Sequence, residues 1–257
     1  MKKVVLSMCV GMAFFAISCS KSTTDEPAPP SPVPDDKKVE IKISPAIDES
    51  RATDYGFETG DHIGLYVVNY DGATPGVLAD RGNHVDNMRF TYNGTWNPDS
   101  PVYWQDDATH ADFYLYYPYS QVSSVDAYPF EVRADQSTEA AYKASDLMVG
   151  KAVNVAPTAS ATRIPVSHVM SRIMLYLEPG NGFTKESLGT ADVSVKINGV
   201  KCGSTVNLAT GAVTPTGNAT VVSPLFADNA YKALIVPQTV AECNLVTAVS
   251  YTHLTLP

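Results

Sequence analysis

DFYLYYP, residues 112–118, is the stretch that decides the fold class of this chain. The large side chains of Phe113, Leu115 and Tyr117 alternate with those between them, and a two-residue period is typical of a β-strand with one face against a core. One set of these side chains must face inward whatever the protein does. We therefore predict a strand whose aromatic residues belong mostly to the core.

The same period recurs from residue 39 onward, in the runs 39–43, 62–68, 173–177 and 193–197. The only weak helical candidate is residues 183–188. Many short alternating runs predict an all-β protein made of antiparallel β-sandwiches and not a parallel sheet.

Turn-forming pairs separate these runs. Asn198-Gly199 stands between the apolar runs VSVKI and VKCGS and predicts a tight hairpin, because both residues tolerate a positive φ. The other pairs are Asp71-Gly72, Asn93-Gly94 and Thr210-Gly211.

The chain is long enough for two modest domains. The best boundary is AVNVAPTASATR, residues 152–163, which is rich in small residues, polar residues and proline. We expect an N-terminal β-sandwich over residues 39–160 and a C-terminal β-sandwich over residues 161–257.

The N-terminus reads as an export signal. Residues 1–18 combine a basic start with an apolar stretch that is shorter than the roughly 20 residues of a membrane-spanning helix. The segment AISC that ends at Cys19 is similar to a lipobox, so we expect cleavage before Cys19 and lipidation of that residue; the alternative is an ordinary signal with an incidental cysteine. The Pro-rich polar residues 19–38 would then tether the folded part to a membrane.

The charge of the mature chain argues against some partners. Loss of residues 1–18 removes two of the 18 basic residues and none of the 27 acidic ones, so the net charge changes from −9 to −11. An acidic surface disfavours nucleic acid and anionic lipid as ligands.

Two cysteines remain in the mature chain besides Cys19. Cys202 and Cys243 are too far apart in sequence to suggest a metal site. They are either buried thiols or one disulfide, because an exported protein meets an oxidising compartment.

No pattern of catalytic residues is present. The histidines stand singly, and the chain has no zinc-protease frame, no G-x-S-x-G segment, no phosphate-binding glycine loop and no EF-hand loop. Four aspartates flank an aromatic segment at spacings that fit no calcium loop: Asp99, Asp106, Asp107 and Asp112. We therefore expect no enzyme activity, no catalytic residue, no metal and no cofactor.

A cluster of aromatic residues has two interpretations. Such rings fill sandwich cores, which we favour for most of them, and exposed rings also stack on sugars. The cluster comprises Tyr92, Trp96, Tyr103, Trp104, Phe113, Tyr114, Tyr116, Tyr117 and Tyr119.

Several segments resemble, in order, motifs of the fimbrillin family of Mfa-like lipoproteins, the type V pilins. They are RAT at 51–53 with FETGDHIGLY at 57–66, VYW at 102–104 with ADFYLYYPY at 111–119, SDLM at 145–148, PVSHVMSRI at 165–173 and LIVPQT at 234–239. The ordered set spans residues 39–249.

The resemblance implies a pair of transthyretin-like β-sandwiches on an outer-membrane lipoprotein at the cell surface. In polymerising members a protease removes the N-terminal segment, and a strand of the next subunit fills the groove by strand addition. Carried over to this chain, Ile41 and Ile43 lie on the strand that would be lost, and Arg51 lies in the cleavage loop. The alternative is that Arg51 is an uncut loop residue.

The end of the chain departs from the family pattern. Residues 250–257, SYTHLTLP, do not resemble the family's ending, so we expect them to be non-native and the second sandwich to be incomplete.

These observations lead to two hypotheses. The first is a structural or adhesive subunit of a surface fimbria whose partners are other fimbrial subunits, joined by strand addition, and surface glycans or proteins. The alternative is a stand-alone surface lipoprotein that binds glycans through exposed aromatics.

Overall fold

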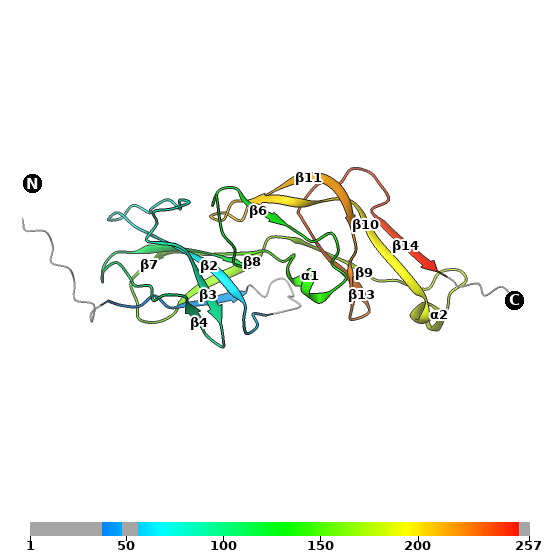
Figure 1. Ribbon diagram of the computed structural model, residues 1–257, viewed down its shortest axis with the longest axis horizontal. Helices are drawn as coiled ribbons and strands as arrows, with labels where there is room; N and C mark the ends of the chain where they lie inside the picture. Colours follow the sequence, from blue (N-terminus) through cyan, green and yellow to red (C-terminus); the bar gives the residue numbers. More distant parts are fainter. Residues whose placement is uncertain (1–37, 48–55, 252–257) are drawn as a thin grey trace, which may run out of the picture. The chain divides into compact units, whose positions relative to one another are not determined.

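Residues 111–117 form β5, the central strand of a seven-stranded sheet whose strands β2, β3, β4, β7 and β8 are labelled in Figure 1. The computed structural model describes residues 38–47 and 56–251. In spatial order the strands are β1 (Ile43–Ile47), β8 (Thr162–His168), β7 (Met148–Val155), β5 (Ala111–Tyr117), β2 (His62–Asn69), β3 (Val85–Tyr92) and β4 (Trp96–Pro98). Strand β1 pairs in parallel with β8, and the other neighbours pair antiparallel.

Two smaller sheets form the rest of the described structure. The long strand β10 (Asp192–Val206) pairs with β11 (Val213–Val222), β14 (Val246–Tyr251) and β6 (Tyr128–Glu131). Strand β13 (Ala230–Ile235) pairs with β12 (Leu225–Ala227) and β9 (Ser171–Leu175). The all-β class predicted from the two-residue period is confirmed.

The described helices are short. Helix α1 (Glu139–Lys143) begins after Thr138, whose side chain accepts a hydrogen bond from the Ala141 amide. Helix α2 (Lys185–Thr190) overlaps the helical candidate seen in the sequence. Neither helix has the length or the apolar composition to span a membrane.

Strands β2 and β5 of the seven-stranded sheet are buried on both faces, so the prediction of one inward set on β5 was too simple. Phe113 and Leu115 contribute to one apolar cluster, together with residues of β2 and β8. Tyr114 and Tyr116, on the opposite face, contribute to a second cluster that extends to β10 and β13. A local period records alternation, but only the packing of a second layer decides whether the other face is also covered.

The prediction of a hairpin at Asn198-Gly199 was wrong. Both residues lie inside β10, at a register shift against β11 that marks a β-bulge, and Gly199 has a φ of 71°. A bulge uses the same positive φ as a tight turn. At this point the partner on the other edge of β10 also changes, from β14 to β6.

The strand pairing crosses the residue range that the sequence favours as a domain boundary. Residues 156–161 form the loop of the β7–β8 hairpin, so β8 belongs to the seven-stranded sheet although it follows residue 160. Strand β6 precedes residue 160 and pairs with β10. A division at residues 160 and 161 does not separate the sheets, and the two-domain organisation stays a prediction.

Candidate functional site: the N-terminal strand and its groove

Residues 39–47 form an extended segment that bonds to two different elements. The amide of Ile41 donates to the carbonyl oxygen of Val102 over 2.8 Å, and the amide of Trp104 donates to the carbonyl oxygen of Val39 over 2.9 Å. The second half of the segment is β1, which pairs in parallel with β8 over residues 162–166. The segment therefore closes the edge of the seven-stranded sheet.

The side chains of this segment complete an apolar core. Ile41 and Ile43 are 1% and 5% exposed and belong to the cluster that contains Trp104, Ile164 and Val166. Burial of one such side chain stabilises a fold by about 1.5–3 kcal/mol. Removal of the segment would therefore expose an apolar groove flanked by unpaired backbone groups of β8.

A hollow of about 630 Å³ lies between β1 and β4, which are the two outer strands of the sheet. One wall is formed by residues 40–45, and the other by Tyr92 and residues 94–98. The ring of Trp96 meets that of Phe57 edge to face, with centroids 4.9 Å apart, and lies 5.1 Å from that of Tyr92. The three aromatic side chains are partly buried.

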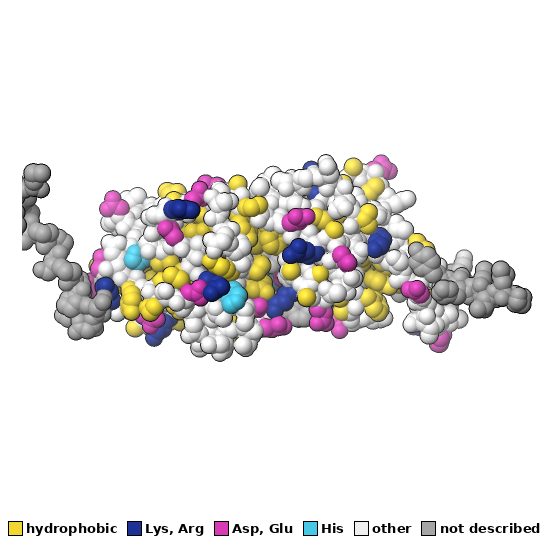
Figure 2. Space-filling model, in the orientation of Figure 1, with side chains coloured by type: hydrophobic (Ala, Val, Ile, Leu, Met, Phe, Trp, Pro, Cys, Tyr) yellow, Lys and Arg dark blue, Asp and Glu magenta, His cyan; other side chains and the backbone are white. Residues whose placement is uncertain are grey.

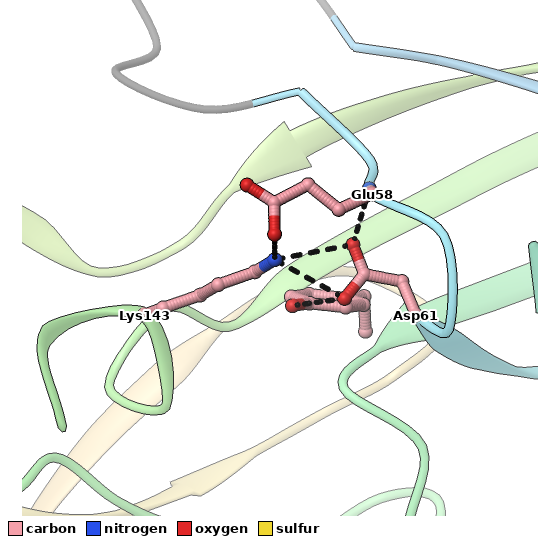
Figure 3. Close-up of polar contacts among 4 residues, drawn as sticks. Glu58, Asp61 and Lys143 are labelled. Atoms are coloured by element: carbon pink, nitrogen blue, oxygen red, sulfur yellow. Dashed lines mark hydrogen bonds and ion pairs between the residues drawn. The ribbon is translucent and has the colours of Figure 1, made fainter. Parts of the chain in front are cut away.

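Four polar residues join the loop before β2 to helix α1 and strand β5 (Figure 3). The Nζ of Lys143 lies 2.8 Å from Oε2 of Glu58 and 3.2 Å from Oδ1 of Asp61. Asp61 also accepts hydrogen bonds from the Glu58 amide and from the Tyr117 hydroxyl, at 2.8 and 3.2 Å. We call Glu58, Asp61, Lys143 and Tyr117 the clasp.

The pKa values of Lys143 and Tyr117 are both raised within the clasp. Burial lowers the pKa of Lys143, but hydrogen bonds to Glu58 and Asp61 outweigh that effect and raise the pKa above its ordinary value. Burial is the main cause that raises the pKa of Tyr117, and the negative charge of Asp61 adds to it. Lys143 therefore stays cationic and Tyr117 stays a hydrogen-bond donor at neutral pH.

Some predicted site residues lie outside the described residues. Cys19, the predicted lipidation site, and Arg51, the predicted cleavage site, both fall there. Cys202 is buried and Cys243 is exposed, and both thiols are free. Burial raises the pKa of the Cys202 thiol.

The four aspartates considered for calcium make protein contacts. Asp99 pairs with Arg89, Asp106 accepts from the turn at Ala108 and Thr109, and Asp112 accepts from Tyr70 and the Asn154 amide. Across residues 38–47 and 56–251, no group of three or more His, Cys, Asp or Glu side chains could hold a metal ion.

The aromatic cluster divides by position. Five members are buried: Trp104, Phe113, Tyr114, Tyr116 and Tyr117. Tyr92, Trp96 and Tyr119 are partly buried, and Tyr103 is 39% exposed. The core interpretation holds for most of the cluster, whereas Tyr92 and Trp96, which line the hollow, stay partly accessible.

The sequence did not indicate the clasp or the hollow between β1 and β4. Lys143 is 85 positions from Glu58 in the chain, so no local spacing could reveal that contact. The motif FETGDHIGLY did single out Phe57, Glu58 and Asp61, but by resemblance alone and without a role for each side chain.

Comparison with known proteins identifies the protein family. The family model described as fimbrillin-like matches residues 50–256, which is most of the chain. The chain belongs to the fimbrillin-like family.

Two curated relatives come from Bacteroides. A Bacteroides ovatus protein, by inferred role the fimbrium tip subunit Fim1C, is 34% identical over 119 residues, which cover 40% of this chain and 21% of the relative. A Bacteroides uniformis protein, by inferred role the fimbrium subunit Fim1C, is 28% identical over 198 residues, which cover 75% of this chain and 61% of the relative. The chain thus spans less than two thirds of the length of either relative.

Two solved structures share the fold. One is a protein from Bacteroides uniformis with the inferred role of a cell adhesion protein. It superposes with a TM-score of 0.63 at 21% sequence identity, and the match covers 85% of this chain and 80% of the other. A protein of the same inferred role from Bacteroides ovatus also gives a TM-score of 0.63, at 16% identity, with 82% and 85% of the two chains covered. At these identities the likeness establishes the fold alone.

Proposed function

We propose that this chain is a structural or adhesive subunit of a cell-surface fimbria and has no enzymatic role. The observation that carries the proposal is that segment 39–47 lies at the edge of its sheet and fills an apolar groove with Ile41 and Ile43. The family membership and the inferred roles of the relatives support it. A strand from another subunit could replace this segment by the same main-chain hydrogen bonds and the same alternate side chains.

The release step would be proteolysis at Arg51. This residue follows β1 in sequence and precedes Phe57, so a cut there would separate residues 39–47 from the rest of the described fold. The core would then lose Ile41 and Ile43 and expose the groove to a donor strand. Anchorage would come from lipid on Cys19, which would place the protein at the outer membrane.

Treatment of the purified protein with an arginine-specific protease tests the assembly. We expect cleavage at Arg51 followed by fibres in electron micrographs, and neither in Arg51→Gln. A product that stays uncut, or that is cut but monomeric, would exclude a role in the fibre shaft. It would favour a tip adhesin or the alternative of a stand-alone surface lipoprotein that binds glycans.

Anchorage is tested separately in cells. Radiolabelled palmitate should be incorporated into the full-length protein and should be absent from Cys19→Ala. Equal labelling of the two proteins would contradict lipidation at Cys19.

A further inference from the structure

The hollow between β1 and β4, called the groove from here on, is distinct from the apolar groove that the N-terminal segment fills. It combines aromatic and polar residues, which β-strand addition does not require. Trp96 and Tyr92 stand on one wall with Asn97, and Glu40, Lys42 and Ser44 stand on the other. All four polar residues are exposed to solvent. The lining of the hollow thus combines aromatic residues with solvent-exposed polar residues.

The charge of the groove restricts its ligand. Among the described residues that line it, only Glu40 and Lys42 are charged, and their charges cancel. An anionic or cationic ligand would gain no net attraction there. The volume of about 630 Å³ lies within the range of roughly 300–1,000 Å³ that is usual for ligand sites.

A sugar ring matches this arrangement. Its C–H face is apolar and packs on an aromatic ring, while the hydroxyl groups at its edge both donate and accept hydrogen bonds. Trp96 and Tyr92 supply the ring faces. The side-chain nitrogen of Asn97 donates to Asn93 and Thr95, which leaves its oxygen as an acceptor. The Glu40 carboxylate is a further acceptor, the Lys42 ammonium is a donor, and the Ser44 hydroxyl can do both.

We propose that the groove between β1 and β4 is a binding site for a neutral oligosaccharide, with Trp96 as the main stacking residue. The proposal rests on the glycan-binding alternative given above, for which it names the site, and it does not depend on polymerisation. One wall of the site is the N-terminal segment itself. Sugar binding is therefore a property of the chain whose residues 39–47 are in place, and it ends if that segment is removed.

Trp96 offers a direct reporter because the chain has two tryptophans. The other, Trp104, is 3% exposed, and its indole nitrogen donates to the Thr158 carbonyl oxygen. In Trp104→Phe, the fluorescence would come from Trp96 alone, inside the groove. A ligand that stacks there should change the emission saturably and should protect the ring from acrylamide quenching.

The test begins with the uncut protein on an array of neutral, sialylated and sulfated oligosaccharides. We expect binding to neutral glycans, and the strongest of them is then titrated by isothermal calorimetry and into Trp104→Phe. Trp96→Ala should weaken binding at least tenfold, whereas Tyr176→Ala, which removes an exposed ring away from the groove, should leave it unchanged. Circular dichroism melts verify that each variant is folded.

Three results would overturn the proposal: no binding to any neutral glycan, binding to acidic glycans alone, or full affinity in folded Trp96→Ala. None of them bears on fibre formation, which is measured after proteolysis by electron microscopy. Fibres without sugar binding would leave the fimbrial role intact and remove the site. Sugar binding without fibres would support the site and count against the fimbrial role.

Discussion

At the scale of single residues, side-chain amides take the place of missing strand neighbours. Gln136 is fully buried, and its amide donates to the Leu234 carbonyl oxygen and accepts from the Leu234 amide, at 2.7 and 2.9 Å. Leu234 lies past the end of β12, where β13 has no strand partner on that edge within the described structure. Gln238, in the segment LIVPQT, makes the same pair of bonds to Lys201 at the irregular part of β10.

Replacement of Gln136 tests this role. Gln136→Leu should reduce the free energy of unfolding by about 2–4 kcal/mol, because the buried Leu234 amide and carbonyl lose their partners. Urea denaturation measures the change. The exposed Gln121 provides the control, and Gln121→Leu should change stability by no more than about 0.5 kcal/mol.

Gly64, in the segment FETGDHIGLY, is required by a close approach across the sheet. It pairs with Tyr116 on β5, and a Cβ atom at position 64 would collide with that tyrosine ring. Gly64→Ala should therefore destabilise the fold by about 1–3 kcal/mol in chemical denaturation. Gly56→Ala is the matched control, since a Cβ there meets nothing within 4 Å; equal effects of the two would contradict the explanation.

At the scale of elements, the clasp holds the loop before β2 in position. Lys143→Met would leave the partly buried carboxylate of Asp61 without its cation, whereas Lys185→Met, at an exposed residue, is the control. We expect faster hydrogen exchange at the amides of Glu58 and Asp61 in the first variant alone. Unchanged exchange there would show that the clasp does not order the loop.

The N-terminal segment depends on its alternate side chains. Ile41→Ala should reduce stability by about 2–5 kcal/mol because it leaves a cavity in the core. Lys42→Ala removes an exposed side chain from the same segment and should have little effect. Thermal melts of the uncut protein compare the two variants. Equal losses of stability would contradict the explanation that Ile41 faces the core and Lys42 does not.

At the scale of the whole molecule, one of the two apolar clusters is shared between the sheets, whereas the other belongs to the seven-stranded sheet and its flanking segments. The second apolar cluster extends from Tyr66 and Tyr114 of the seven-stranded sheet to β10 and β13. Acidic and basic side chains are interspersed on the face drawn in Figure 2, with apolar atoms between them.

The tyrosines of this shared cluster predict a loss of stability at alkaline pH. Burial, with a smaller contribution from Asp86 and Asp80, raises the pKa of Tyr66 from 10.0 to about 12, and burial also raises that of Tyr114 to about 12. The unfolded chain ionises first, so their contribution to stability is present below pH 10 and declines as the pH rises toward 12. Urea midpoints measured over this range should fall, and Tyr66→Phe should show a smaller fall than the unchanged protein.

The sequence by itself determined the all-β class, the turns at Asn93-Gly94 and Thr210-Gly211, the short helix near residues 183–188 and the family. These features depend on side-chain period, on residues that tolerate a positive φ and on motifs of adjacent positions, all of which are local. Only the tertiary structure decided that β5 is covered on both faces, that Asn198-Gly199 is a bulge, that β8 joins the first sheet, and that Lys143 meets Asp61. Each of these depends on partners far away in the chain, because a strand or a charge takes the neighbour that the packed sheets bring to it.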